Sequence, residues 1–400
     1  MKDLQSTLPL AGIRVLDLTQ ALAGPYAGLI LADMGADVIK VERPPDGDPA
    51  RHIPPHVNGE SAYFMSVNRN KRSLVLDLTQ PAGKELFYDL VGNSDVVLDN
   101  FRPGVMERLQ VDYETLVAIN PRVVSCSISA FGQDGPYRNR PAYDLVLQAM
   151  SGLMSVTGEP GRPPVRMGLP MGDLGGGLFA VVGIQAALLQ RSHTNRGQMV
   201  DVALLDTLVG MHTYLASTYF VTDENPEPVG SGHHNIVPYQ AFRAADEYFV
   251  VATFTDAFWK KLCRATELDY LIEDPRFRNH EGRKQHRETL VATLEDTFRR
   301  RPRAEWLQRL EAHGVPCAPV NSLGEALSDP QVLHRQMTMR VQHPVAGTVR
   351  LAGSPLKFNA AEVPSQPPPQ LGEHTREVLA SVAGYEQAQI DDLYAAGIVC

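Results

Sequence analysis

The first part of the chain alternates between short apolar runs and segments with helical spacing, and this alternation restricts it to few folds. Runs rich in Val, Ile and Leu occur at residues 13–18, 36–42, 73–78, 96–98 and 123–128. Residues 24–34, and the segment that begins at Pro81, place apolar side chains on one face of a helix instead. Strand–helix–strand units connect through right-handed crossovers and build parallel sheets. We therefore predict an α/β fold with a mainly parallel sheet and helices on both sheet faces.

Two segments rich in proline and glycine interrupt the chain, at residues 222–238 and 363–370. Between them, residues 248–252 predict a strand, and residues 256–313 have helical spacing with charged faces. We predict that residues 1–221 form the first part of a large domain. Residues 222–328 form a smaller α/β domain with its linker, and residues 329–400 return to the large domain.

Charge and cysteine content exclude several classes of protein. The chain has 37 basic and 46 acidic residues, a net charge of −9, which disfavours nucleic-acid binding but permits a local basic pocket for an anionic ligand. Its four cysteines are far apart and form no CxxC pair. No disulfide framework and no metal site is expected, and a cytoplasmic location fits this pattern best.

Familiar nucleotide and hydrolase motifs are missing from the sequence, and no membrane association is expected. The chain has no GxGxxG after its first strand, no Walker motif, no GxSxG and no HExxH. Its longest nearly apolar run covers only residues 178–189, whereas a bilayer-spanning helix needs about 20 apolar residues. We interpret this run as a buried helix.

A glycine-rich segment, residues 168–177, precedes that helix and contains Asp173. An aspartate at a helix start is often an N-cap. However, four glycines within the six residues 172–177 are not needed for a cap and would let another molecule approach the backbone. A carboxylate at the positive end of a helix would also stay ionised and act as a nucleophile. Both interpretations stay open at this point.

Cationic and aromatic residues follow several of the predicted strands. Arg43 comes after the strand at 36–42, and Asn100, Phe101 and Arg102 come after the strand at 96–98, with Arg108 nearby. The carboxyl ends of parallel strands meet at one edge of a sheet, where ligands bind. Cations beside an aromatic ring suit a phosphorylated nucleotide with a base that can stack. For any single arginine, ordinary surface charge is the simpler interpretation.

In their order and spacing, these segments resemble the family III CoA-transferases, also called the CaiB/BaiF family, and in particular formyl-CoA transferase. The resemblance covers nearly the whole chain. It rests on LAGIRVLD (10–17), AGP (23–25), GADVIKVE (35–42), NKRS (70–73), NFRPG (100–104), GD (172–173), RGQ (196–198), VDV (200–202), GVPCAPV (314–320) and LGEHT (371–375).

The resemblance implies a Rossmann-like large domain built from both chain ends, a small domain between them, and an interlocked homodimer. It implies that Asp173 is the nucleophile and that the CoA thioester is a substrate, with no permanently bound cofactor and no metal. The residues implied to bind CoA are Arg43, Leu76, Asp77, Thr79, Asn100, Phe101, Arg102, Arg108 and Tyr143.

The implied reaction moves CoA from an acyl-CoA to a small carboxylic acid through an aspartyl anhydride and an aspartyl-CoA thioester. Leu22 stands where formyl-CoA transferase has a ligand-binding glutamine, which makes a formyl/oxalate pair doubtful. A loop with Gly230, Gly232, His233, His234 and Asn235 resembles that of relatives that use dicarboxylates, with succinyl-CoA as the expected donor. A linker with turn residues explains this loop almost as well.

Two alternatives stay open. The α-methylacyl-CoA racemases share the fold and use a His/Asp pair, but the histidine position is Tyr143 here, and a phenol with a pKa near 10 is a poor substitute for imidazole. A non-catalytic CoA-binding protein would have no need to retain Asp173.

Overall fold

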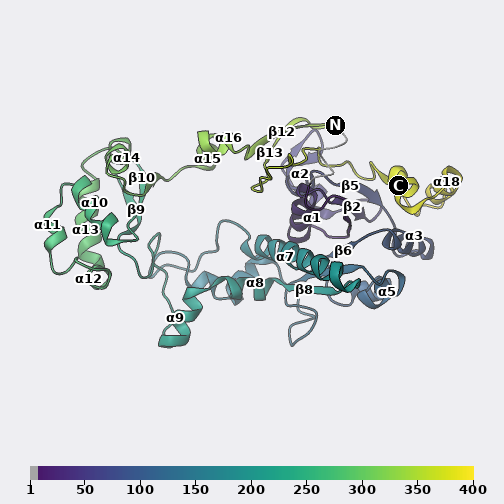
Figure 1. Ribbon diagram of the computed structural model, residues 1–400, viewed down its shortest axis with the longest axis horizontal. Helices are drawn as coiled ribbons and strands as arrows, with labels where there is room; N and C mark the ends of the chain where they lie inside the picture. Colours follow the sequence, from purple (N-terminus) through teal and green to yellow (C-terminus); the bar gives the residue numbers. More distant parts are fainter. Residues whose placement is uncertain (1–7) are drawn as a thin grey trace. The chain divides into compact units, whose positions relative to one another are not determined.

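The computed structural model describes residues 8–400, which form two compact units. The first unit contains the chain up to Ser151, Met167–Thr213 and Pro330–Cys400, and the second contains Gly152–Arg166 and Tyr214–Asp329 (Figure 1). The domain boundaries predicted from the linkers, at residues 222 and 328, stay a prediction.

A six-stranded sheet with the order β5-β2-β1-β6-β7-β8 forms the centre of the first unit. All five strand pairs are parallel, as predicted. The strands are β1 Arg14–Asp17, β2 Asp37–Glu42, β5 Arg72–Val75, β6 Val96–Asp99, β7 Val124–Ser129 and β8 Met199–Ala203. Every residue of β6 and β7 is buried. Val96, Val97 and Leu98 of β6 form an unbroken apolar run, whereas β7 alternates apolar residues with buried serines.

Helices cover both faces of this sheet. On one face, Leu16, Ile39 and Leu74 of the strands pack into a core with Phe87 of α3 (Pro81–Gly92) and Leu379 near the C-terminus. Segments from the two ends of the chain therefore meet in one core. In Figure 1, α3 and α18 (Gln387–Ala395) lie near each other, and the Tyr385 hydroxyl donates a hydrogen bond to Asp89 of α3 at 2.7 Å.

On the other face, α1 (Ala23–Asp33) packs against α7 (Met171–Thr194), and α7 packs against β7, β8 and α8 (Leu204–Met211). The remaining elements of this unit are η2 Pro49–His52, β3 His56–Val57, β4 Glu60–Ser61, α2 Ala62–Asn68, α4 Val105–Leu109, α5 Tyr113–Ile119, α6 Asp144–Met150, α16 Pro330–His334, β12 Thr338–His343, β13 Gly347–Ala352, α17 Thr375–Val378 and η4 Leu379–Ala383.

The second unit has its own core around a three-stranded antiparallel sheet with the order β11-β10-β9. Phe249, Trp259, Phe298 and Trp306 are each at most 2% exposed and lie in this core. The elements are η3 Leu153–Ser155, α9 Tyr214–Thr222, β9 Tyr239–Arg243, β10 Tyr248–Ala252, α10 Asp256–Ala265, α11 Tyr270–Glu273, α12 His280–Gln285, α13 Arg287–Phe298, α14 Arg303–Ala312, β11 Cys317–Pro319 and α15 Leu323–Ser328.

Helix α7 is longer than the apolar run from which we predicted it. With 24 residues it is, among the described helices, long and apolar enough to cross a bilayer, a test that core helices of soluble proteins also pass. The prediction of a buried helix is right for one face only. Ala180 and Ile184 are buried, whereas Phe179 and Val182 are half exposed or more.

Candidate active site

Asp173 is the third residue of α7, so it is not the N-cap of that helix. Pro170 occupies the cap position and makes no side-chain cap hydrogen bond, and the N-cap interpretation of Asp173 is therefore wrong. Burial, and secondarily the charge of Asp144, raise the pKa of Asp173 to about 6. The carboxylate is still mostly ionised at pH 7. Its basicity is higher than that of an exposed aspartate, which favours attack on a carbonyl carbon.

A short chain of hydrogen bonds holds the loop that leads to Asp173. Asp144, the first residue of α6, accepts one bond from the Gly172 N–H at 2.7 Å and another from the Gln148 amide at 2.6 Å. The Gln148 side-chain oxygen accepts a bond from the Met167 N–H at 2.9 Å. Since Asp144 receives both of its bonds, an acceptor-only group is required at this position. Asp144 therefore holds the loop that leads to Asp173 and also raises the pKa of Asp173.

The glycines around Asp173 serve helix packing. A Cβ at Gly176 would lie 2.2 Å from a Leu204 side-chain carbon of α8, and a Cβ at Gly177 would lie 2.7 Å from the Ala23 carbonyl oxygen of α1. The Gly172 N–H is occupied by Asp144. We expected these glycines to open the backbone to another molecule. Instead, they let α1 and α8 pack closely beside Asp173.

Tyr63 is a neighbour of Asp173 that sequence reasoning missed. It lies on α2 and is partly buried, and burial together with the charges of Asp173 and Asp48 raises the pKa of its phenol. The phenol is therefore held in its protonated form within the electrostatic reach of Asp173. No local motif marks this position, because the interaction depends on how α2 packs.

The residues implied to bind CoA mostly gather at the carboxyl edge of the sheet. Three strands, β5, β2 and β6, lie within four neighbouring positions of the sheet, and predicted CoA ligands follow each of them. These ligands are Arg43 after β2; Leu76, Asp77 and Thr79 after β5; and Asn100, Phe101 and Arg102 after β6. Arg43, Arg102 and Arg108 are exposed. Leu76 is 1% exposed and its N–H donates to the Glu42 carbonyl at 2.8 Å, so neither its side chain nor its N–H is open to a ligand. Tyr143 is the N-cap of α6 and directly precedes Asp144.

Asn100 already has partners within the chain. Its side-chain oxygen accepts a hydrogen bond from the Gln20 N–H, and its amide nitrogen donates one to the Gln20 carbonyl, both at 2.8 Å. Asn100 therefore links the end of β6 to the turn between β1 and α1.

A cavity of about 200 Å³ lies at the same edge, and Phe101 and Arg102 line it together with Asp99. Asp99 is 1% exposed and accepts hydrogen bonds from the Ser127 hydroxyl at 2.5 Å and the Phe101 N–H at 3.1 Å. Burial raises the pKa of Asp99 to about 6, although both hydrogen bonds favour its charged form. The cavity wall therefore carries a carboxyl group that titrates close to neutral pH.

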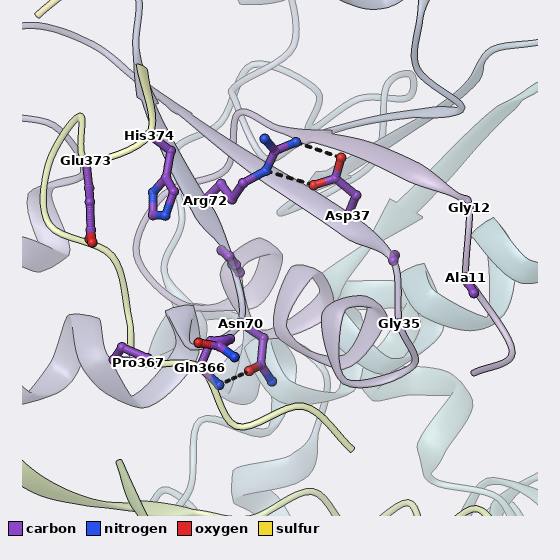
Figure 2. A pocket seen from close by; sticks show the side chains of 12 residues that line it. Ala11, Gly12, Gly35, Asp37, Asn70, Arg72, Gln366, Pro367, Glu373 and His374 are labelled. Atoms are coloured by element: carbon purple, nitrogen blue, oxygen red, sulfur yellow. Dashed lines mark hydrogen bonds and ion pairs between the residues drawn. The ribbon is translucent and has the colours of Figure 1, made fainter. Parts of the chain in front are cut away.

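A larger cavity, of about 570 Å³, is lined by residues at the opposite, amino edge of the sheet (Figure 2). Arg72 lines it, but both ends of its guanidinium fork donate to Asp37, at 2.9 and 2.7 Å. The His374 Nδ1 atom accepts a hydrogen bond from the Ser73 N–H at 3.3 Å. Asp37 already neutralises the Arg72 guanidinium, so the amino edge is the weaker candidate site for an anionic ligand.

The predicted substrate loop, with Gly230, Gly232, His233, His234 and Asn235, lies in the second unit. Arg287 donates hydrogen bonds to the carbonyls of His233 and His234, and Lys284 donates to the Asn235 side chain at 2.9 Å. His233 stacks on Tyr214, and burial, with His234 and Arg287, lowers its pKa. Neutral His233 is therefore no cation for a carboxylate, and Lys284 and Arg287 carry the positive charge here.

Comparison with known proteins identifies the family of the chain. Residues 10–375 match CoA-transferase family III. The chain is 40% identical to a succinyl-CoA:glutarate CoA-transferase of Mus musculus over 99% of its own length and 92% of the relative's. It is 38% identical to an acetyl-CoA:oxalate CoA-transferase of Acetobacter aceti, over 91% of this chain and 93% of that one.

The fold agrees as well. A crystal structure of a CaiB/BaiF family protein from Brucella suis matches with a TM-score of 0.84 at 38% identity, covering 94% of this chain and 99% of that one. The family match and the CoA-transferase relatives, each over nearly the whole length of the chain, assign both family and reaction class. The chain belongs to CoA-transferase family III and is a CoA-transferase.

Proposed function

We propose that this protein transfers CoA from succinyl-CoA to a dicarboxylic acid, with Asp173 as the covalent nucleophile. The observation that carries the proposal is the partly buried Asp173 carboxylate, whose pKa is raised to about 6 beside a second carboxylate. The mouse relative uses succinyl-CoA and glutarate, and the Acetobacter relative uses acetyl-CoA and oxalate. Both acceptors are dicarboxylates, which supports that substrate class.

The proposed reaction conserves charge and needs no ATP. The Asp173 carboxylate attacks the thioester carbonyl, the C–S bond breaks, and CoA leaves as thiolate from an aspartyl–acyl anhydride. The thiolate attacks the aspartyl carbonyl, expels the donor carboxylate and forms an aspartyl-CoA thioester. The acceptor carboxylate then attacks the aspartyl thioester and displaces the thiolate, which gives an aspartyl–acceptor anhydride. The thiolate attacks the acceptor carbonyl of this anhydride, forms the new acyl-CoA and releases Asp173 as a carboxylate. Covalent catalysis thereby divides one difficult exchange into easier steps.

CoA is proposed to bind at the carboxyl edge of the sheet, through Arg43, the 76–79 segment, Phe101, Arg102, Arg108 and Tyr143, whereas the Asn100 side chain already bonds to the Gln20 backbone. Exposed arginines after neighbouring strands support this assignment, because they can pair with phosphates. CoA enters as a thioester substrate, so no resident cofactor is proposed. Tyr143 at the position of the racemase histidine supports CoA transfer over proton transfer at the α-carbon.

The loop of the second unit is proposed to bind the distal carboxylate of the acceptor. Lys284 and Arg287, which bond to the loop, support an anionic ligand there. Arg287→Gln should raise the KM for the acid and leave the KM for succinyl-CoA unchanged. Lys260→Gln, on another helix of the same unit, provides a matched control. Equal effects on both KM values would contradict the assignment.

A substrate panel with adduct trapping tests the whole proposal. Succinyl-CoA is incubated with glutarate, malate, oxalate and acetate, and new CoA esters are identified by mass spectrometry. Without acceptor, the enzyme should accumulate a CoA adduct on Asp173 that hydroxylamine converts to a hydroxamate. Asp173→Ala should retain less than about a thousandth of the transfer rate. An active enzyme that never carries a modification on Asp173 would contradict the covalent route.

We also propose an interlocked homodimer in the cytoplasm. One face of α7 presents apolar side chains to solvent, with Val182 60% and Leu189 66% exposed, and such a surface supports contact with a second copy. All four cysteines are free, which suits a reducing compartment. Light scattering after size exclusion should give twice the chain mass of 43.9 kDa. Val182→Glu should shift it toward the monomer, and a monomeric wild-type protein would contradict the assembly.

A further inference from the structure

The turn between β1 and α1 is held at three successive backbone positions by polar side chains from elsewhere in the chain. The Lys40 ammonium donates to the Thr19 carbonyl at 2.8 Å, and the Asn100 amide makes two bonds of 2.8 Å to the Gln20 backbone. The Ala21 N–H donates to Asp48 at 3.0 Å. Such a series of side-chain bonds to one turn fixes its backbone more firmly than local turn bonds do.

Ala21 shows that this turn does not relax to an ordinary conformation. Its φ is +63°, in the left-handed region that a residue with a Cβ rarely adopts. The bond from Ala21 to Asp48 therefore holds the chain in a conformation that alanine alone would leave. Strain of this kind concentrates at functional sites, where the surrounding structure maintains it.

The groups that hold the turn are buried charges. Lys40 and Asp48 form an ion pair of 2.8 Å, with side chains 0% and 1% exposed. Burial opposes the ionisation of Asp48, but Lys40 and the N–H groups of Ala21 and Ala50 outweigh it, and its pKa is lowered. A buried ion pair adds little stability compared with apolar residues of similar size. Its presence at this turn therefore requires a reason other than stability.

The turn lies beside the nucleophile's helix. It leads into α1, which packs on α7 so closely that Gly177 has no room for a Cβ against the Ala23 carbonyl. Gly177 is one helical turn from Asp173. The negative charges of Asp173 and Asp48 both raise the pKa of the Tyr63 phenol, in addition to burial. The three holding side chains and the nucleophile thus belong to one connected region.

We propose that Lys40, Asp48 and Asn100 are positioning residues, which fix the turn at Thr19–Ala21 so that an acyl-CoA is aligned for attack by Asp173. The inference rests on the proposed function and adds residues to it. For Asn100 it assigns a role through the Gln20 backbone, where the family resemblance implies direct contact with CoA. None of the three takes part in bond making.

The first test uses Asn100→Asp, which keeps the acceptor for the Gln20 N–H and loses the donor to its carbonyl. We expect kcat for transfer from succinyl-CoA to fall between about tenfold and a hundredfold, as small misplacements of a reacting group do. The KM of the acid and the Kd of CoA should stay within about twofold. Asn93→Asp, at an exposed position, is the matched control. A tenfold weaker Kd for CoA with unchanged kcat would assign Asn100 to ligand contact and overturn the proposal.

The second test relieves the strain at Ala21. Asp48→Asn places an amide against the Lys40 ammonium, and kcat should fall as for Asn100→Asp. Adding Ala21→Gly should restore about fivefold of the lost kcat, because glycine adopts a positive φ freely. The same change should restore nothing in Asp173→Asn. A folded Asp48→Asn variant that Ala21→Gly does not improve would overturn the proposal.

Hydrogen–deuterium exchange separates this inference from the proposed function. Asn100→Asp and Asp48→Asn should each speed the exchange of backbone amide hydrogens in the peptide that spans residues 18–24, whatever the enzyme's substrates are. Unchanged exchange there would show that these side chains do not hold the turn and would overturn the proposal. A wild-type protein that transfers no CoA from succinyl-CoA would instead refute the proposed function, and the exchange rates would still decide whether the turn is held.

Discussion

The charge of Asp144 should be visible in the pH dependence of catalysis. Asp173 has a pKa of about 6 against an ordinary value of 3.8, and burial is the larger cause, with Asp144 second. Asp144 therefore accounts for less than half of the difference, which is about one pH unit at most. Asp144→Asn should lower the midpoint pH of the acid limb of the kcat/KM profile for acyl-CoA by up to about one pH unit. One unit corresponds to about 1.4 kcal/mol of interaction between the two carboxylates.

The sign and size of this effect can be checked at low pH. At pH 5, lowering the Asp173 pKa from about 6 to about 5 raises the ionised fraction about fivefold. Relative activity at pH 5 against pH 8 should therefore rise by up to this factor. Among the other titratable side chains near α7, the phenols of Tyr63 on α2 and Tyr26 on α1 have raised pKa values and stay protonated in this range. Asp33 on α1 is paired with Arg69, and Asp206 on α8 is exposed. Asp206→Asn is therefore the matched control and should leave the limb in place.

The absolute rate of Asp144→Asn should fall for a different reason. The new amide nitrogen would face the Gln148 amide, where Asp144 now accepts its bond of 2.6 Å. Combining Asp144→Asn with Gln148→Glu restores a donor–acceptor pair and still offers an acceptor to the Met167 N–H. We expect the double variant to recover kcat at pH 8, and its acid limb to return toward that of the wild type, because Gln148→Glu returns a carboxylate to the same pair. An acid limb that does not move in the single variant Asp144→Asn would refute the electrostatic role of Asp144.

Three further predictions follow from burial and close contact. Gly177→Ala should destabilise the fold by about 1–3 kcal/mol in urea, because its Cβ would lie 2.7 Å from a backbone oxygen, while Gly210→Ala, with nothing within 4 Å, should not. Asp99 has a pKa of about 6 in the folded protein, so the folded protein binds this proton more tightly than the unfolded chain does. The stability that the proton contributes is therefore lost as the pH rises from about 4 to 6. Asp99→Asn, which stays neutral, should raise the Tm more at pH 8 than at pH 5. Arg43→Ala should raise the KM for acyl-CoA by a factor equivalent to about 1–3 kcal/mol and leave that of the acid unchanged; the reverse pattern would reject Arg43 as a CoA ligand.

The parallel sheet was predictable because its strands are buried on both sides. β6 begins with an unbroken run of Val and Leu, and β2 has Val and Ile on both sides of the buried Lys40, which the sequence displays directly. β7 alternates apolar residues with buried serines. β8 was not predicted as a strand, because it lies at the edge of the sheet and exposes Met199 and Asp201. A strand with solvent on one side lacks that continuous apolar signal.

The candidate site was predictable only where one residue carries the chemistry. Asp173 stands out beside its glycines, but the start of α7 at Met171 was missed because glycine and proline favour a loop. The true reason for Gly177 lies in Ala23, far away in the sequence. Tyr63 and Asp48 belong to the site through tertiary packing alone, so no local pattern could indicate them.

The raised pKa of Asp173 has a consequence for the order of events in the proposed reaction. In the aspartyl–acyl anhydride, CoA thiolate can attack either carbonyl and expels the other carboxylate. A free carboxylic acid has a pKa of about 4.3, so the substrate is a better leaving group than Asp173 at about 6. The thiolate should therefore favour the aspartyl carbonyl by roughly tenfold, which releases the donor acid and makes the aspartyl-CoA thioester the species that accumulates without acceptor. Asp144→Asn lowers the pKa of Asp173 and should therefore reduce the amount of aspartyl-CoA thioester, measured as hydroxamate per mole of enzyme. An equal hydroxamate yield in the variant and the wild type would show that the basicity of Asp173 does not decide which carbonyl the thiolate attacks.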